Sequence, residues 1–161
     1  MRKVALYTDG DLELVRVLKK EKTLGAYIFL CSVKRVSGIN IITHEEKRNL
    51  HKKIAYSKSS VSKYFRQLVK LGWADKTKDG YYLISYGRIA RDRGITTSRF
   101  RKVQGESKRE VLARAAGMYI KSNLKAQYKK EYTARRKDKI GDIIRYYDPK
   151  VKFTVRKLAK L

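Results

Sequence analysis

The sequence predicts a mainly α-helical fold with one small β-hairpin and a basic, largely helical extension toward the C-terminal side. Three observations predict it. Apolar residues repeat every three or four positions over residues 57–71, which is the period of an amphipathic helix. An Asp79-Gly80 pair follows soon after and is a strong signal for a tight turn between two strands. Residues 106–137 lack proline and are rich in Ala, Lys, Arg, Glu and Gln, the composition of a long helix.

The charge of the chain narrows the class of partner. Its 161 residues include 41 Lys and Arg against 15 Asp and Glu, a formal net charge of +26. Such an excess repels itself unless a polyanion neutralises it, so nucleic acid is the first expected partner, an anionic membrane the second and acidic proteins the third. Residues 1–85 carry a net charge of +10 and residues 86–161 a net charge of +16. Both halves could neutralise phosphates, which predicts binding that weakens as the salt concentration rises.

The sequence indicates a protein that folds inside the cell. The apolar stretch within residues 1–11 is too short for a signal peptide, and acidic residues follow it too closely. No 18-residue apolar span is present. Cys31, the single cysteine, excludes an internal disulfide and a multi-cysteine metal site, and we expect it as a buried thiol. We therefore expect a cytoplasmic location, or packaging within a nucleoprotein particle, and no membrane partner.

Composition divides the chain into four segments. We expect an N-terminal segment over residues 1–22, a domain over residues 23–85, a connector over residues 86–105 and a basic helical region over residues 106–161. The connector is polar, basic and interrupted by two glycines, with a short helical piece expected near residues 98–104.

Two helices are expected in the first part of the domain. The apolar run over residues 24–36 has apolar residues on most faces, which predicts a buried helix that ends near Gly38. Thr43 is expected to cap a second helix over about residues 44–54.

The third helix carries the candidate interface. Ser57 is expected to cap it and Gly72 to end it, with Val61 and Leu68 on its inward face. The opposite face holds short polar, basic and amide side chains, which can approach a DNA groove closely and reach base edges or phosphates. These candidate binding residues are Lys58, Ser59, Ser62, Lys63, Arg66, Gln67 and Lys70.

A hairpin is expected directly after this helix. Trp73 and Leu83 are expected to anchor it to the core, and Asp79-Gly80 to form its two-residue turn. Lys76 and Lys78 lie before the turn and are further candidate binding residues.

The serine-rich start SKSSVSK, the Gly-Trp helix stop and the lysine-bearing hairpin together resemble the winged helix-turn-helix superfamily over about residues 23–85. The resemblance implies that the third helix enters the DNA major groove and that the hairpin, the wing of the family, contacts phosphate or the minor groove. Ala55 stands in the turn between the second and third helices, where many relatives have glycine. Residues 86–161 resemble no family.

The long C-terminal helix supplies the remaining candidates. Its distal part is too basic for a buried role, and Lys129, Lys130, Arg135 and Arg136 are expected to contact nucleic acid. The helix either pairs with a second subunit, as a homodimer, or runs along the DNA. Repulsion between two such helices weakens the dimer interpretation. The role of residues 140–161 is left open.

No catalytic, cofactor-binding or metal-binding set is evident in the sequence. His44 and His51 are seven residues apart, roughly 10 Å along a helix, which is too far to share one metal ion. The few carboxylates do not cluster as in a two-metal nuclease, and no phosphate-cradling glycine motif is present. We therefore expect a protein that is not an enzyme.

The resulting functional expectation is a winged-helix binder of double-stranded DNA, acting as a transcriptional regulator or another site-binding factor, with DNA favoured over RNA. Two alternatives stay open. One is a structural nucleoprotein, either a ribosome-like RNA binder or a phage or mobile-element protein packaged with its genome. The other is a replication or packaging initiator.

Overall fold

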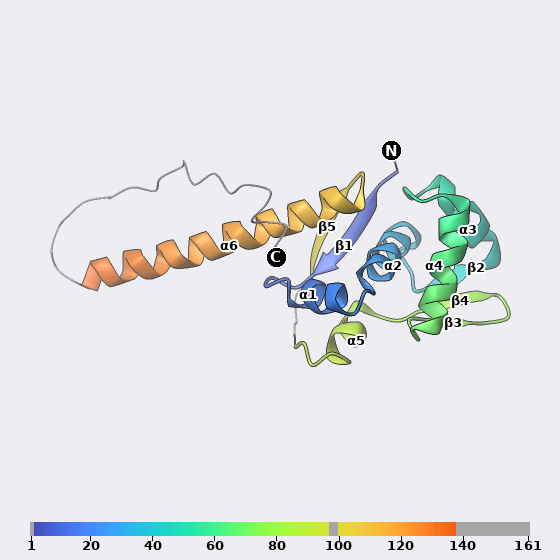
Figure 1. The fold of residues 1–161 in the computed structure, drawn as a ribbon, viewed down its shortest axis with the longest axis horizontal. Helices are drawn as coiled ribbons and strands as arrows, with labels where there is room; N and C mark the ends of the chain where they lie inside the picture. The colour runs from blue at the N-terminus through green and yellow to red at the C-terminus, as the bar shows by residue number, and fades with distance from the viewer. Residues whose placement is uncertain (1, 97–99, 138–161) are drawn as a thin grey trace. The chain divides into compact units, whose positions relative to one another are not determined.

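The computed structural model describes the backbone of residues 2–96 and 100–137, and side chains as far as residue 127 (Figure 1). The chain divides into two compact units, Met1–Ala115 and Ala116–Leu161. Helix α6 (Lys108–Lys137) begins in the first unit and makes up the described part of the second. Every other helix and strand that the structure describes belongs to the first unit.

The N-terminal segment is part of the core of the first unit. Strand β1 (Val4–Thr8) pairs antiparallel with strand β5 (Arg101–Gly105), so that Val4 lies opposite Gly105. Helix α1 (Glu13–Lys20) follows, and the buried carboxylate of Asp9 accepts hydrogen bonds from the first N–H groups of this helix at 2.9 and 3.2 Å. The carboxylate thereby satisfies backbone donors that a helix start leaves open.

Helix α2 (Leu24–Ser37) is the centre of the first unit and lies between β1 and helix α4 (Figure 1). Its residues 26–33 are all buried, as the apolar run predicts. Ser32 accepts a hydrogen bond from the Ala5 N–H at 3.0 Å, and Tyr27 donates one to the Tyr7 carbonyl at 2.6 Å. The helix ends at Gly38, whose φ of 69° is the left-handed conformation that favours glycine.

A second, three-stranded antiparallel sheet has the order β2-β4-β3. It consists of β2 (Ile41–Thr43), β3 (Ala74–Lys76) and β4 (Gly80–Leu83). Gly80 pairs with Thr43, and a Cβ atom added at Gly80 would lie 2.0 Å from the Ile42 carbonyl oxygen. Only glycine therefore allows β2 and β4 to approach at this point.

The expected second helix is shorter than the sequence predicts. Helix α3 (His44–Asn49) gives way to a 3-10 turn, η1 (Leu50–Lys52), rather than continuing to residue 54. Thr43 caps α3 as expected, in a reciprocal capping box with Glu46. The following turn does not require glycine, because Ala55 does not adopt a positive φ.

The expected third helix is confirmed as α4 (Lys58–Lys70). The Ser57 side chain accepts a hydrogen bond from the Ser60 N–H at 3.2 Å, and Gly72 has a φ of 67° just after the helix. Val61, Phe65 and Leu68 are buried on its inward face. Trp73 and Leu83, the expected anchors of the hairpin, are also buried.

Two elements lie within residues 86–105, the segment expected to connect the domains. Helix α5 (Tyr86–Arg91) is capped by Ser85, and β5 pairs with the N-terminal strand. The prediction of a short helical piece near residues 98–104 was wrong for Arg101–Gly105, which form a strand. The pairing partner of this strand is about a hundred residues away, so a local pattern could not reveal it.

The described architecture is therefore mixed, with helices predominating and two small antiparallel sheets. Among the described residues, no helix has the length and apolar character that crossing a membrane requires.

Candidate nucleic-acid interface

The outward face of α4 presents most of the predicted binding residues together. The helical period of the sequence is enough to distinguish this face from the buried apolar face, because the two sets of residues lie on opposite sides of one helix. Gln67 is half-buried at the flank of the face. The exposed members are Lys58, Ser59, Ser62, Lys63, Arg66 and Lys70.

The cations of this face are not neutralised within the fold. The side chains of Lys58, Lys63, Arg66 and Lys70 make no hydrogen bond or ion pair with any residue that the structure describes. No acidic side chain occurs on α4 itself. The face is therefore a concentrated, solvated positive surface of the kind that a polyanion neutralises.

The β3–β4 hairpin is wider at its tip than predicted. β3 ends at Lys76 and β4 begins at Gly80, so three residues rather than two connect the strands. The Thr77 N–H donates to the Gly80 carbonyl at 2.9 Å, and the Gly80 N–H donates to the Thr77 hydroxyl at 3.1 Å. Gly80 is therefore the first residue of β4 and not a residue of the turn, and it lies against the backbone of Ile42 in β2.

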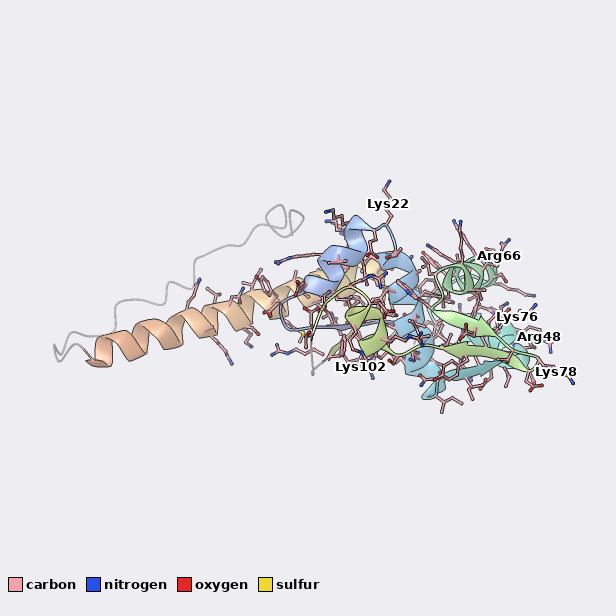
Figure 2. All side chains as sticks on the ribbon, turned by 90° about the horizontal axis from the view of Figure 1, so that it is seen from below. Lys22, Arg48, Arg66, Lys76, Lys78 and Lys102 are labelled. Atoms are coloured by element: carbon pink, nitrogen blue, oxygen red, sulfur yellow. The ribbon has the colours of Figure 1, made fainter. Side chains whose placement is uncertain are left out.

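The lysines of the hairpin are exposed, as expected, but acidic neighbours offset them. Asp75 and Asp79 flank Lys76 and Lys78 in the sequence, and all four side chains are exposed. Figure 2 shows Arg66, Lys76 and Lys78 at the same end of the first unit. The hairpin thus extends the surface of α4 with two positive side chains but little net charge.

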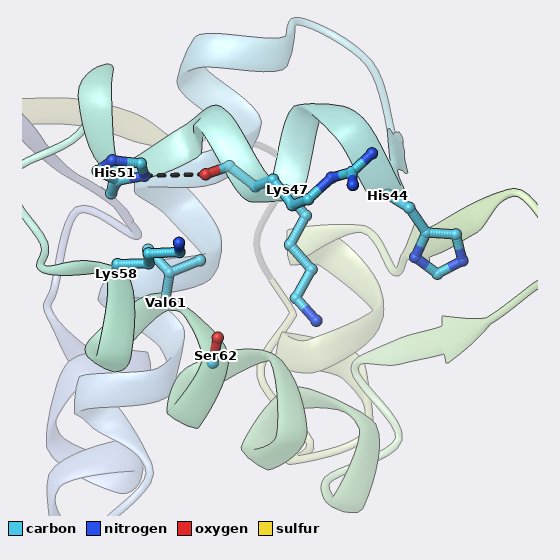
Figure 3. A pocket seen from close by; sticks show the side chains of 7 residues that line it. His44, Lys47, His51, Lys58, Val61 and Ser62 are labelled. Carbon is cyan, nitrogen blue, oxygen red and sulfur yellow. Dashed lines mark hydrogen bonds between the residues drawn. The ribbon is translucent and has the colours of Figure 1, made fainter.

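A groove of about 340 Å³ separates α3 and η1 from the start of α4 (Figure 3). Among the residues that the structure describes, no acidic side chain lines it. His51 is held against α3 by a 2.9 Å hydrogen bond between its Nδ1 and the Arg48 carbonyl oxygen. The lining residues are His44, Lys47, Arg48, His51, Lys58, Val61 and Ser62.

Sequence reasoning assigned none of the α3 residues of this groove to the interface. The signal was present, because His44, Arg48 and His51 follow each other at intervals of four and three residues on one helix face. What the sequence could not show is that this face opens toward α4.

Some lysines are used by the fold and are not available to a partner. Lys47 donates to the Tyr81 hydroxyl at 2.9 Å and lies over the Tyr81 ring. Lys34 donates to the Ile84 carbonyl at 2.7 Å, and burial lowers the pKa of its ammonium group. Lys108 donates to the Tyr64 hydroxyl. These cations stabilise packing, whereas those of α4 do not.

The remaining predicted residues lie in the second unit. Lys129, Lys130, Arg135 and Arg136 are part of α6, but their side chains are outside the described residues, and their role stays a prediction.

The described residues contain no group of three or more His, Cys, Asp or Glu side chains that could hold a metal ion. Cys31 is fully buried, and that burial raises the pKa of its thiol to about 12. A thiol in this state is a packing group, because thiolate is the reactive form.

Comparison with models of protein families, with curated proteins and with solved structures gives no match to this chain.

Proposed function

We propose that this protein binds double-stranded DNA through α4 and the β3–β4 hairpin, in the manner of winged helix-turn-helix proteins. The observation that carries the proposal is the exposed face of α4, whose cations have no partner among the described residues. The order of the elements supports the proposal. The helices and strand α2, β2, α3 and α4 are followed by β3 and β4, and β4 pairs with both β3 and β2.

The geometry suits a helix in the major groove. That groove is about 12 Å wide and admits one α-helix. Ser59 and Ser62 are short, so the backbone of α4 can approach the base pairs closely. Arg66 can donate two parallel hydrogen bonds to a guanine edge, while Lys63 can reach a base or a phosphate.

The groove between α3 and α4 offers a place for the DNA backbone beside the bases. Arg48 of α3 and Lys58 of α4 line it from its two sides, and Ser62 of α4 adds a hydroxyl group to the lining. Contacts of this kind set the position of a reading helix without carrying sequence information.

The role we propose is that of a cytoplasmic transcriptional regulator or another site-binding factor. A structural nucleoprotein, packaged with its genome or bound to structured RNA, is the second candidate. The net charge of +16 over residues 86–161 favours it, because a helix and a hairpin alone do not need so large an excess. An initiator of replication or packaging would use the same α4 surface.

A competition titration separates these roles. Binding of the full chain to a pool of duplexes and to a structured RNA is measured at two salt concentrations, each with and without random-sequence competitor. The regulator proposal predicts that selected duplexes survive competition. Affinity that falls equally for every sequence as salt rises would instead support the nucleoprotein.

A further inference from the structure

The turn between α1 and α2 carries lysines that the fold does not use. Lys19, Lys20 and Lys22 are exposed and make no hydrogen bond or ion pair through their side chains with any described residue. The turn is a Schellman arrangement, in which the Thr23 N–H donates to the Leu18 carbonyl at 2.9 Å and the Lys22 N–H to the Lys19 carbonyl at 3.1 Å.

Lys22 occupies the position of this turn where glycine is the usual residue. Its φ is 60°, in the left-handed region that disfavours a side chain. Leu12, the other non-glycine residue with a positive φ, is buried, so packing accounts for it. Lys22 is exposed, and its side chain gives the fold nothing in return for the strained backbone.

The acid in the same turn does not offset these lysines. The Glu21 carboxylate accepts hydrogen bonds from the Arg93 guanidinium at 2.7 to 3.1 Å. Arg93 in turn lies over the ring of the buried Trp73. Glu21 is therefore committed to a contact that ties the end of α1 to the chain beyond α5.

The first turn of α2, which follows these lysines in the chain, lies against a side chain of α4. Gly25, three residues after Lys22, is so close to Tyr64 of α4 that an added Cβ would lie 3.3 Å from the Tyr64 hydroxyl oxygen. Figure 2 shows Lys22 and Arg66 pointing toward the same side of the first unit, whereas Lys102 lies at another side. Lys22 in the α1–α2 turn and the positive surface of α4 thus face the same side of the first unit.

We propose that the α1–α2 turn is a second phosphate-binding element, which contacts the DNA backbone beside the segment bound by α4. This inference rests on the proposed function. DNA is the occupant that the charges favour, because a duplex offers a row of phosphates continuous with those beside α4. Lys22 anchors the contact, and Lys19 and Lys20 add charge from the last turn of α1.

The test compares Lys22→Gly with Lys102→Ala in the full chain. Both variants remove one exposed lysine, but only Lys22 lies on the same side of the first unit as Arg66 (Figure 2). Glycine suits the backbone at residue 22, so the melting temperature of Lys22→Gly should stay the same or rise by a few degrees. Its affinity for a duplex should nevertheless fall roughly three- to tenfold, and the slope of log K against log salt should shrink by about 0.9.

The result that would overturn the inference is a Lys22→Gly variant with the same affinity and salt slope as Lys102→Ala. Arg66→Ala, measured alongside, separates this outcome from failure of the proposed function. If the wild-type chain binds no duplex, the proposed function fails. If Arg66→Ala weakens binding and Lys22→Gly does not, only the second element is wrong.

Discussion

The ammonium group of Lys47 in α3 donates a hydrogen bond to the hydroxyl of Tyr81 in β4, 2.9 Å away. Lys47 also lies over the rings of Tyr81 and Phe65. Its neighbour Arg48 is exposed and lines the groove toward α4. Two adjacent cations therefore have different tasks, one within the fold and one on its surface.

This difference predicts that a substitution at Lys47 lowers stability, whereas a substitution at Arg48 weakens DNA binding. Lys47→Met should lower the free energy of unfolding by about 1–3 kcal/mol, because it removes a charge-assisted hydrogen bond and two cation–π contacts. Arg48→Ala should leave stability within about 0.5 kcal/mol of wild type and weaken duplex binding. Urea unfolding and a duplex titration of both variants check this. Equal loss of stability in the two would contradict the assignment.

Substitutions at Ser57 can distinguish the role of the helix cap in stability from the effect of charge at the start of α4 on DNA binding. Ser57→Ala should destabilise the protein by about 1 kcal/mol, because the Ser60 N–H loses its acceptor. Ser57→Asp keeps an acceptor and should retain stability, yet it places a negative charge at the start of the proposed DNA-binding helix. We expect weaker duplex binding for Ser57→Asp despite its intact fold, measured by thermal unfolding and titration. Unchanged affinity would argue against DNA close to this end of α4.

The burial of Cys31 predicts a loss of stability in alkali. Burial raises the pKa of the folded thiol to about 12, from 9.0 in the unfolded chain. The unfolded state therefore releases its proton first, so the contribution is complete below pH 9 and is lost as the pH rises toward 12. Burial raises the pKa of Tyr27 in the same direction.

Cys31→Ala checks the contribution of the thiol. Above pH 9, the fall of unfolding free energy with pH should be less steep in this variant, by about 1.4 kcal/mol per pH unit at most. Identical slopes in the two proteins would show that Cys31 does not titrate in this way. The slopes are compared rather than the absolute stabilities, because alanine also leaves a small cavity.

The sequence predicted α2, α4 and the β3–β4 hairpin because each has a local signature. These signatures are the helical spacing of apolar residues, a capping serine and the glycines at residues 38 and 72. Each lies within or next to the element that it predicts. The strands β1, β2 and β5 have no such signature. They are three to five residues long, and each finds its partner only through long-range pairing.

The candidate interface divides in the same way. The exposed face of α4 follows from helical period, which fixes both sides of a helix at once. The groove below α3 and the place of the lysine turn on the same side as Arg66 depend on how separate elements pack. The φ of Lys22 is likewise a property of the folded turn. These features required the structure.

The most direct test of DNA binding by α4 compares Arg66→Ala with Lys78→Ala on one preferred duplex and on random-sequence duplexes. Arg66 lies on the proposed reading face, and Lys78 lies at the tip of the hairpin. Arg66→Ala should weaken the preferred duplex by about 1–3 kcal/mol more than the random ones, whereas Lys78→Ala should weaken all duplexes alike. Equal, uniform losses in both variants would contradict base reading by α4.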